Sequence, residues 1–120
     1  MFSFETDMSN AKTQIRVADK QLDFPGILQR MIELSTCYIV LFGHWQLNCC
    51  TDNNIYAIDK NGDILWNIQD VLSEHLGNRK DVWYPQMNMT PEGLSVLSYH
   101  GIRYLLDPKQ GQLIRKQFVK

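Results

Sequence analysis

Apolar and polar positions alternate with a period of two over much of the chain, which is typical of half-buried β-strands. The clearest case is residues 54–68, where two β-prone runs flank Asn61-Gly62. Asn-Gly supplies the positive φ angles that tight hairpin turns need. On the second arm, Ile64, Trp66 and Ile68 are spaced to share one face. This pattern predicts a β-hairpin whose turn is Asn61-Gly62.

A second unit with the same plan lies near the C-terminus. Residues 94–99 and 102–106 are expected to form strands that are joined by a turn at His100-Gly101. Residues 107–111 contain Pro and Gly at positions that turn geometry favours, and residues 112–119 alternate as a closing strand. The sequence therefore predicts two hairpin-containing units.

The two units form an internal repeat. The strand over residues 37–42 matches the strand over residues 94–99, and each copy ends in an Asp, Asp59 or Asp107, followed by a Gly-containing turn. An Asp that precedes a turn bonds the local backbone N–H groups, so we assign both carboxylates to turns rather than to a catalytic pair. The spacing of roughly 50 residues is close to that of propeller blades.

The rhythm of strand, Asp59, Gly62 and Trp66 resembles the blades of quinoprotein-type β-propellers. The second copy keeps Asp107 and Gly111 but has no Trp. A propeller needs at least four blades, and this chain holds about two. We therefore expect a mainly β fold, an antiparallel β-sandwich or curled sheet built from two blade-like repeats, with one short α-helix. The resemblance implies no quinone or metal site.

The remaining segments are less regular. Residues 13–18 are expected to form a short strand, whereas residues 27–34 suit either a strand or a helix face, and we favour the strand. Residues 70–76 predict the short helix, with Asp70 as its N-cap. We expect a single domain over residues 1–120, in which residues 1–12 are the candidate flexible segment.

Composition places the chain among soluble globular proteins, with 44% hydrophobic and 21% charged residues. No apolar run is long enough for a transmembrane helix, and the first residues lack the features of a signal peptide. The three cysteines, Cys37, Cys49 and Cys50, include an adjacent pair and make a poor disulfide framework. These features favour the cytoplasm and predict neither a disulfide nor a membrane partner.

Charge is uneven along the chain. Residues 1–78 carry ten acidic and five basic side chains, whereas residues 79–120 carry three and seven. Either the two parts pair with complementary charge, or the first part presents an acidic face to a basic partner. The net charge of −1 argues against general binding of nucleic acid.

The sequence gives little sign of catalytic chemistry. His44, Cys49 and Cys50 suggest a zinc site, but adjacent cysteines on a strand point to opposite faces and structural zinc cysteines are spaced by two to four residues. His75 and His100 are isolated histidines in the sequence. We therefore expect no enzyme activity, no metal and no cofactor.

Aromatic residues in predicted loops are more informative. Trp45 lies between two predicted strands, and Trp83-Tyr84 follows the predicted helix. Loop aromatics that are flanked by charge make good interface anchors, although they also cap the ends of cores.

The hairpin of residues 54–66, followed by the Gly-x-x-Tyr-x-x-Asp-Pro-x-x-Gly unit of residues 101–111, resembles small immunity proteins of bacterial contact-dependent inhibition and other polymorphic toxin systems. The resemblance covers residues 23–120 and implies stoichiometric binding of a cognate toxin C-terminal domain, often a nuclease, in the cytoplasm. It implies no catalytic residue. The alternatives are a generic interaction domain with propeller-like repeats and a small hydrolase. The expected partner-binding residues are Trp45, Asp52, Asp70, Glu74, Trp83 and Tyr84.

Overall fold

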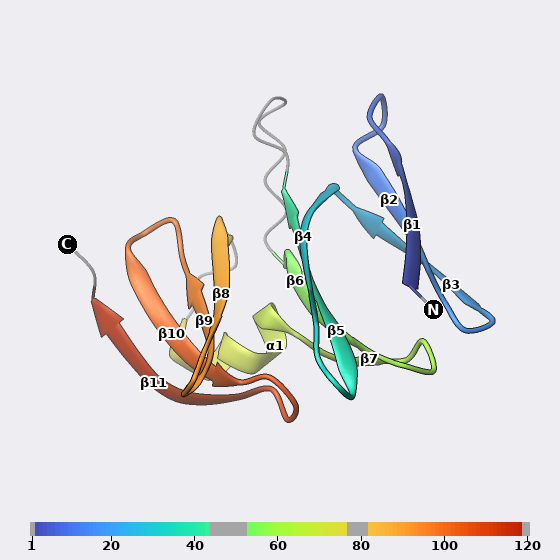
Figure 1. Cartoon of the computed structure of the whole chain (residues 1–120). Helices are drawn as coiled ribbons and strands as arrows, with labels where there is room; N and C mark the ends of the chain where they lie inside the picture. Colours follow the sequence, from blue (N-terminus) through green and yellow to red (C-terminus); the bar gives the residue numbers. More distant parts are fainter. Residues whose placement is uncertain (1, 44–52, 77–81, 119–120) are drawn as a thin grey trace.

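The computed structural model describes residues 2–43, 53–76 and 82–118, which form three antiparallel β-sheets and one short helical segment (Figure 1). This confirms the mainly β, antiparallel fold. In chain order the elements are β1 (Phe2–Asp7), β2 (Lys12–Val17), β3 (Lys20–Pro25), β4 (Ile27–Glu33), β5 (Cys37–Gly43), β6 (Ile55–Asp59), β7 (Ile64–Asn67), α1 (Ile68–Leu72), a 3-10 turn (Ser73–His75), β8 (Gln86–Thr90), β9 (Gly93–Leu97), β10 (Ile102–Asp107) and β11 (Gln112–Phe118).

Each sheet is a meander in which neighbours in the chain are neighbours in space. Sheet A has the strand order β1-β2-β3, sheet B has β4-β5-β6-β7, and sheet C has β8-β9-β10-β11. Sheet B lies between the other two, with sheet A (blue) on one side and sheet C (orange and red) on the other (Figure 1). The fold is therefore a stack of three β layers.

The central layer explains why β5 does not alternate. All of its residues are buried, because sheet B is covered on both faces. Ile39 and Leu41 belong to the core that sheet B shares with sheet C. Val40 and Phe42 belong to the core that it shares with sheet A.

Sheet A extends the fold beyond the two repeats that the sequence predicted. β2 alternates as expected, with Ile15 and Val17 fully buried and Arg16 exposed between them. β1 pairs with β2 along its whole length, from the Phe2–Val17 pair to the Asp7–Lys12 pair. The candidate flexible segment of residues 1–12 therefore contains an edge strand of sheet A.

The β6–β7 hairpin is confirmed, but its turn is longer than a two-residue turn. Gly62 has a φ of +92°, and Asn61 does not have a positive φ. The Gly62 N–H donates to the Asp59 carbonyl at 3.1 Å, and the Asp59 carboxylate accepts the N–H groups of Asn61 and Asp63, each at 2.9 Å. Asp59 thus has the turn role that its position in the sequence predicted.

The predicted common face of Ile64, Trp66 and Ile68 is wrong. The register shifts by one residue, so that Ala57 pairs with Trp66 whereas Ile58 pairs with Ile64. Because of this bulge, Ile64 is 47% exposed while Trp66 is buried. Ile68 already belongs to α1.

The helix lies where the sequence placed it but begins earlier. Its N-cap is Asn67, whose side-chain oxygen accepts the N–H of Asp70 at 2.9 Å, so the assignment of Asp70 as N-cap is wrong. α1 itself ends at Leu72 and continues as the 3-10 turn. The strand interpretation of residues 27–34 is confirmed by β4.

Trp66 connects sheet B to sheet C through a hydrogen bond and a packing contact. Its indole N–H donates to the carbonyl of Pro108 at 2.8 Å, in the turn between β10 and β11. Gly111 in the same turn has a φ of +65°, and a Cβ there would lie 2.6 Å from Trp66 Cγ. A glycine is therefore required by both the backbone and the ring that packs on it.

Candidate partner-binding surface

The predicted binding residues fall in two connections of sheet B. Asp70, Glu74, Trp83 and Tyr84 all lie between β7 and β8, the connection that leads from sheet B to sheet C. Trp45 and Asp52 lie outside the described residues, in the stretch of chain between β5 and β6. The structure therefore describes the positions of four of the six residues.

Tyr84 does not have the surface position that an anchor needs. Its side chain is fully buried and packs edge-on against Tyr104, with ring centroids 6.2 Å apart. Its backbone N–H donates to Asn54 Oδ1 at 3.0 Å, and its carbonyl accepts from Asn54 Nδ2 at 2.7 Å. Burial raises the pKa of the Tyr84 hydroxyl. Tyr84 is a core residue, which was the alternative reading for loop aromatics.

Trp83, the neighbouring residue, is half-buried and belongs to an exposed group of rings. Its indole stacks on Tyr99, with centroids 5.7 Å apart and planes 16° apart. Tyr99 is 44% exposed, and its ring centroid lies 3.9 Å from that of His100. The Tyr99 N–H donates to the Trp83 carbonyl at 3.1 Å, which fixes the two rings together. We call Trp83, Tyr99 and His100 the aromatic cluster.

Sequence reasoning did not find Tyr99 and His100 as site residues. They occupy the tight connection between β9 (Gly93–Leu97) and β10, whereas the sequence placed Tyr99 in the preceding strand and only His100 in the turn. The available signal was the adjacent pair of aromatic rings beside Gly101, because small and polar residues are the usual choice in turns.

Asp70 and Glu74 present exposed carboxylates in the same connection. Asp70 lies in the first turn of α1, where its carboxylate accepts from the Asn67 side-chain amide at 2.9 Å. Glu74 is exposed on the 3-10 turn that follows. Both carboxylates are therefore accessible to solvent.

The acidic first part (residues 1–78) and the basic second part (residues 79–120) are not joined by any ion pair among the described residues. Lys20–Asp63 and Lys60–Glu33 both join residues of the acidic first part. Arg115–Glu92 joins two residues of the basic second part. Over residues 2–43, 53–76 and 82–118, no ion pair joins the acidic first part to the basic second part. Ion pairs therefore do not support complementary pairing of the two parts, and an acidic face that is free to meet a partner stays a prediction.

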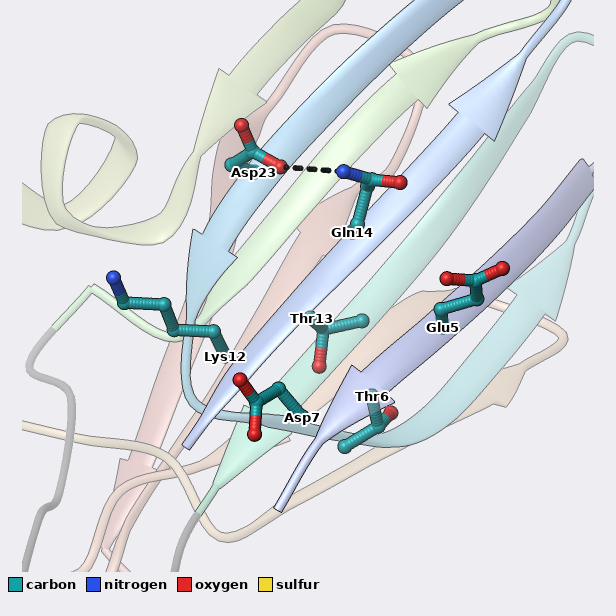
Figure 2. A pocket seen from close by; sticks show the side chains of 7 residues that line it. All are labelled: Glu5, Thr6, Asp7, Lys12, Thr13, Gln14 and Asp23. Atoms are coloured by element: carbon teal, nitrogen blue, oxygen red, sulfur yellow. Dashed lines mark hydrogen bonds between the residues drawn. The ribbon is translucent and has the colours of Figure 1, made fainter. Parts of the chain in front are cut away.

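A second acidic region lies on sheet A. An open hollow of about 430 Å³ on β1, β2 and β3 is lined by three carboxylates together with Lys12, Gln14 and two threonines (Figure 2). Gln14 donates to Asp23 at 3.3 Å there, and hydrogen bonds from Asn10 lower the pKa of Asp7. Glu5, Asp7 and Asp23 thus extend the acidic character of the first part over the outer side of the stack.

Within the described part of the chain, no group of three or more His, Cys, Asp or Glu side chains is arranged to hold a metal ion. Cys49, Cys50 and His44, the residues considered for zinc, lie outside the described residues. Cys37 is a free, buried cysteine, and burial raises the pKa of its thiol.

Comparison with known families gives one match, to the model of a domain of unknown function (DUF7957), over residues 5–118. The chain belongs to this family. The match begins within β1 and ends at the last residue of β11, so the three sheets together make up the family's domain. No curated protein matches the chain. Among the described residues, none of the helical segments has the length and apolar character needed to cross a membrane.

Proposed function

We propose that this protein acts by binding another protein, and that the aromatic cluster is the centre of the contact surface. The observation that carries the proposal is the stack of Trp83 on Tyr99, which is held by a backbone hydrogen bond yet open to solvent. A pre-ordered pair of rings loses little conformational entropy on binding and can bury a large apolar area.

The partner that the sequence resemblance suggests is a toxin domain with a basic groove, for which this protein would be the immunity factor. Nuclease toxins need basic side chains to bind phosphate, and an inhibitor gains from acidic side chains that cover them. Asp70 and Glu74 are exposed in the connection that also carries Trp83 and provide such charge. In this proposal the rings supply affinity, and the carboxylates supply fast, salt-sensitive association.

The test is to look for a toxin gene beside this one, to co-express its C-terminal domain with this protein, and then to measure co-purification and protection. Trp83→Ala and Tyr99→Ala should each weaken the complex by roughly 30-fold or more, because truncation of a central aromatic anchor costs about 2 kcal/mol or more. Leu65→Ala is the control, since Leu65 is 44% exposed on β7, outside the aromatic cluster.

Two results would contradict the proposal. If neither aromatic variant weakens a complex that forms with the parent, the contact surface lies elsewhere. If a partner binds through the aromatic cluster but gives no protection and is not a toxin domain, the protein is a generic interaction domain rather than an immunity factor.

A further inference from the structure

The outward face of sheet C carries a hollow that the proposed protein interface does not use. Tyr104, Leu106 and Val96 face the core shared with sheet B, so the residues between them face outward. The hollow has a volume of about 200 Å³. It is lined by Thr90, Glu92, Ser95, Arg103, Leu105, Arg115 and Gln117.

The strand register explains how the hollow is built. Leu105 pairs with Ser95 on one side and with Arg115 on the other, and Ser95 and Leu105 are each only 7% exposed. These two residues form its floor. Arg103 pairs with Gln117, which places Arg103 diagonally across from Arg115 on the same face.

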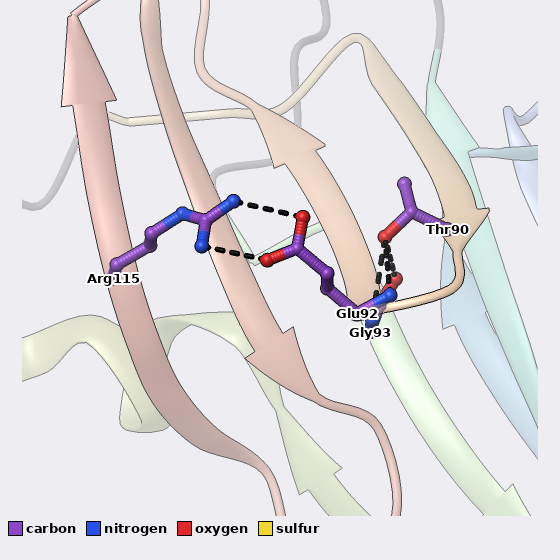
Figure 3. A network of polar contacts seen from close by, with 4 residues as sticks. All are labelled: Thr90, Glu92, Gly93 and Arg115. Carbon is purple, nitrogen blue, oxygen red and sulfur yellow. Dashed lines mark hydrogen bonds and ion pairs between the residues drawn. The ribbon is translucent and has the colours of Figure 1, made fainter.

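Charge in the hollow is unbalanced. The Arg115 guanidinium forms a bidentate salt bridge with the Glu92 carboxylate, with N–O distances of 2.7 and 3.1 Å (Figure 3). The Thr90 hydroxyl accepts the Glu92 N–H at 3.2 Å and so helps to fix this turn. Over the described residues, Arg103 has neither an ion pair nor a hydrogen-bonded acceptor, so the lining of the hollow holds two guanidinium groups and one carboxylate, which is bound to Arg115 alone.

We infer that this hollow is a binding site for an oxyanion, a carboxylate or phosphate group, held between Arg103 and Arg115. The contact with Glu92 already shows that the Arg115 guanidinium can donate to both oxygens of a carboxylate in a bidentate geometry. Arg103 supplies a second guanidinium, and Ser95 and Gln117 supply a hydroxyl and an amide that can donate from the floor and the wall.

Glu92 would act as a built-in competitor for this site. The Glu92 and Arg115 side chains are 59% and 57% exposed, and an exposed pair of this kind contributes little and is screened by salt. An incoming anion can therefore take over the Arg115 fork. Removing the charge of Glu92 should strengthen anion binding, whereas removing Arg103 should weaken it.

The experiment is a titration of the full chain with inorganic phosphate and, separately, with acetate, followed by NMR of backbone amides and arginine Nε–H groups. We expect saturable shifts at Ser95, Arg103 and Gln117. Arg103→Ala should weaken binding by about 10-fold, and Glu92→Gln should tighten it. Arg16→Ala is the matched control, because Arg16 is an exposed arginine on the outward side of sheet A.

Comparison of the dissociation constants for phosphate and acetate shows whether the site prefers a phosphate or a carboxylate group. The inference is overturned if Glu92→Gln shows no saturable shift with either anion, or if Arg16→Ala weakens binding as much as Arg103→Ala does. Arg103 is exposed, so its variant should fold, and dispersed amide signals check this. The aromatic cluster is not altered by these variants, and loss of partner binding would therefore not affect the result.

Discussion

Asn54 shows how much of the fold can depend on a single polar side chain. It is buried, and its amide nitrogen donates to the carbonyls of Phe42 and Tyr84 at 2.9 and 2.7 Å. Its side-chain oxygen accepts the Tyr84 N–H at 3.0 Å. One side chain thus joins the end of β5, the start of β6 and the segment that leads to β8.

We predict that Asn54→Ala destabilises the protein by about 3 kcal/mol, because it leaves buried backbone groups of Tyr84 and Phe42 without partners. Urea unfolding measures the effect. Asn61→Ala is the control: Asn61 is an exposed asparagine in the β6–β7 turn that uses its backbone N–H, and its loss should cost much less. Equal losses for the two variants would show that the Asn54 amide contributes no more than an exposed one.

Tyr84 presents the opposite case, a buried polar group without compensation. Its hydroxyl has no hydrogen-bond partner among the described residues. We predict that Tyr84→Phe raises the free energy of unfolding by about 1 kcal/mol, because an unpaired buried hydroxyl is costly. Tyr99→Phe, at an exposed ring, should change stability little and serves as the control.

The same substitution should alter the dependence of stability on pH. Burial raises the pKa of Tyr84, so the folded state keeps a proton that the unfolded chain releases above about pH 10. Stability therefore falls as the pH rises beyond that value, and Tyr84→Phe should make the fall shallower. Denaturant unfolding of both proteins between roughly pH 8 and 11, a range that includes the pKa of a free tyrosine, measures the dependence of stability on pH. An unchanged slope would mean that Tyr84 ionises as easily when folded.

At the scale of elements, the three-layer stack distinguishes β5 from an ordinary alternating strand. Leu41→Ala and Phe42→Ala should both destabilise the protein by about 3 kcal/mol or more, because these neighbours are buried in different cores. In β2, Ile15→Ala should cost as much, whereas Arg16→Ala should stay within about 0.5 kcal/mol. Chemical denaturation compares the pairs. A small effect at either Leu41 or Phe42 would mean that one face of sheet B is not tightly covered.

Period-two alternation and turn residues were sufficient to predict most strands, since these signals are local. Sheet A was missed as a sheet because the β2–β3 turn at Ala18 and Asp19 lacks a glycine, although Ala18 has a φ of +54°. The start of α1 was misplaced because Asn67 and Asp70 are both good caps, and only the bond from Asp70 N–H to Asn67 decides between them.

The candidate site was less predictable because it depends on contacts between distant parts of the chain. Local sequence indicated Trp83 and Tyr84 as a pair, but neighbours in an extended segment point in opposite directions. Asn54, 30 residues earlier, fixes the backbone of Tyr84, and Tyr99 packs on Trp83 from another turn. No local pattern specifies these partners.

At the scale of the whole molecule, the order of the layers predicts where the protein is most resistant to opening. β5 and β6 are the inner strands of sheet B, which is itself the inner sheet. Their amides are shielded by neighbouring strands within the sheet and by sheets A and C across its faces. Sheets A and C each have one face outside these two cores. Their backbone amides should therefore become exposed to solvent through smaller local opening than the amides of sheet B.

Native-state hydrogen exchange should therefore find the slowest amides in β5 and β6, with exchange free energies that approach that of global unfolding. Amides of β2 and β9, which are inner strands of the outer sheets, should exchange sooner and serve as the internal comparison. Amides of β11, an edge strand whose residues are mostly exposed, should exchange first among the strands. If β2 or β9 were protected longer than β5, sheet B could not be the layer on which the other two depend.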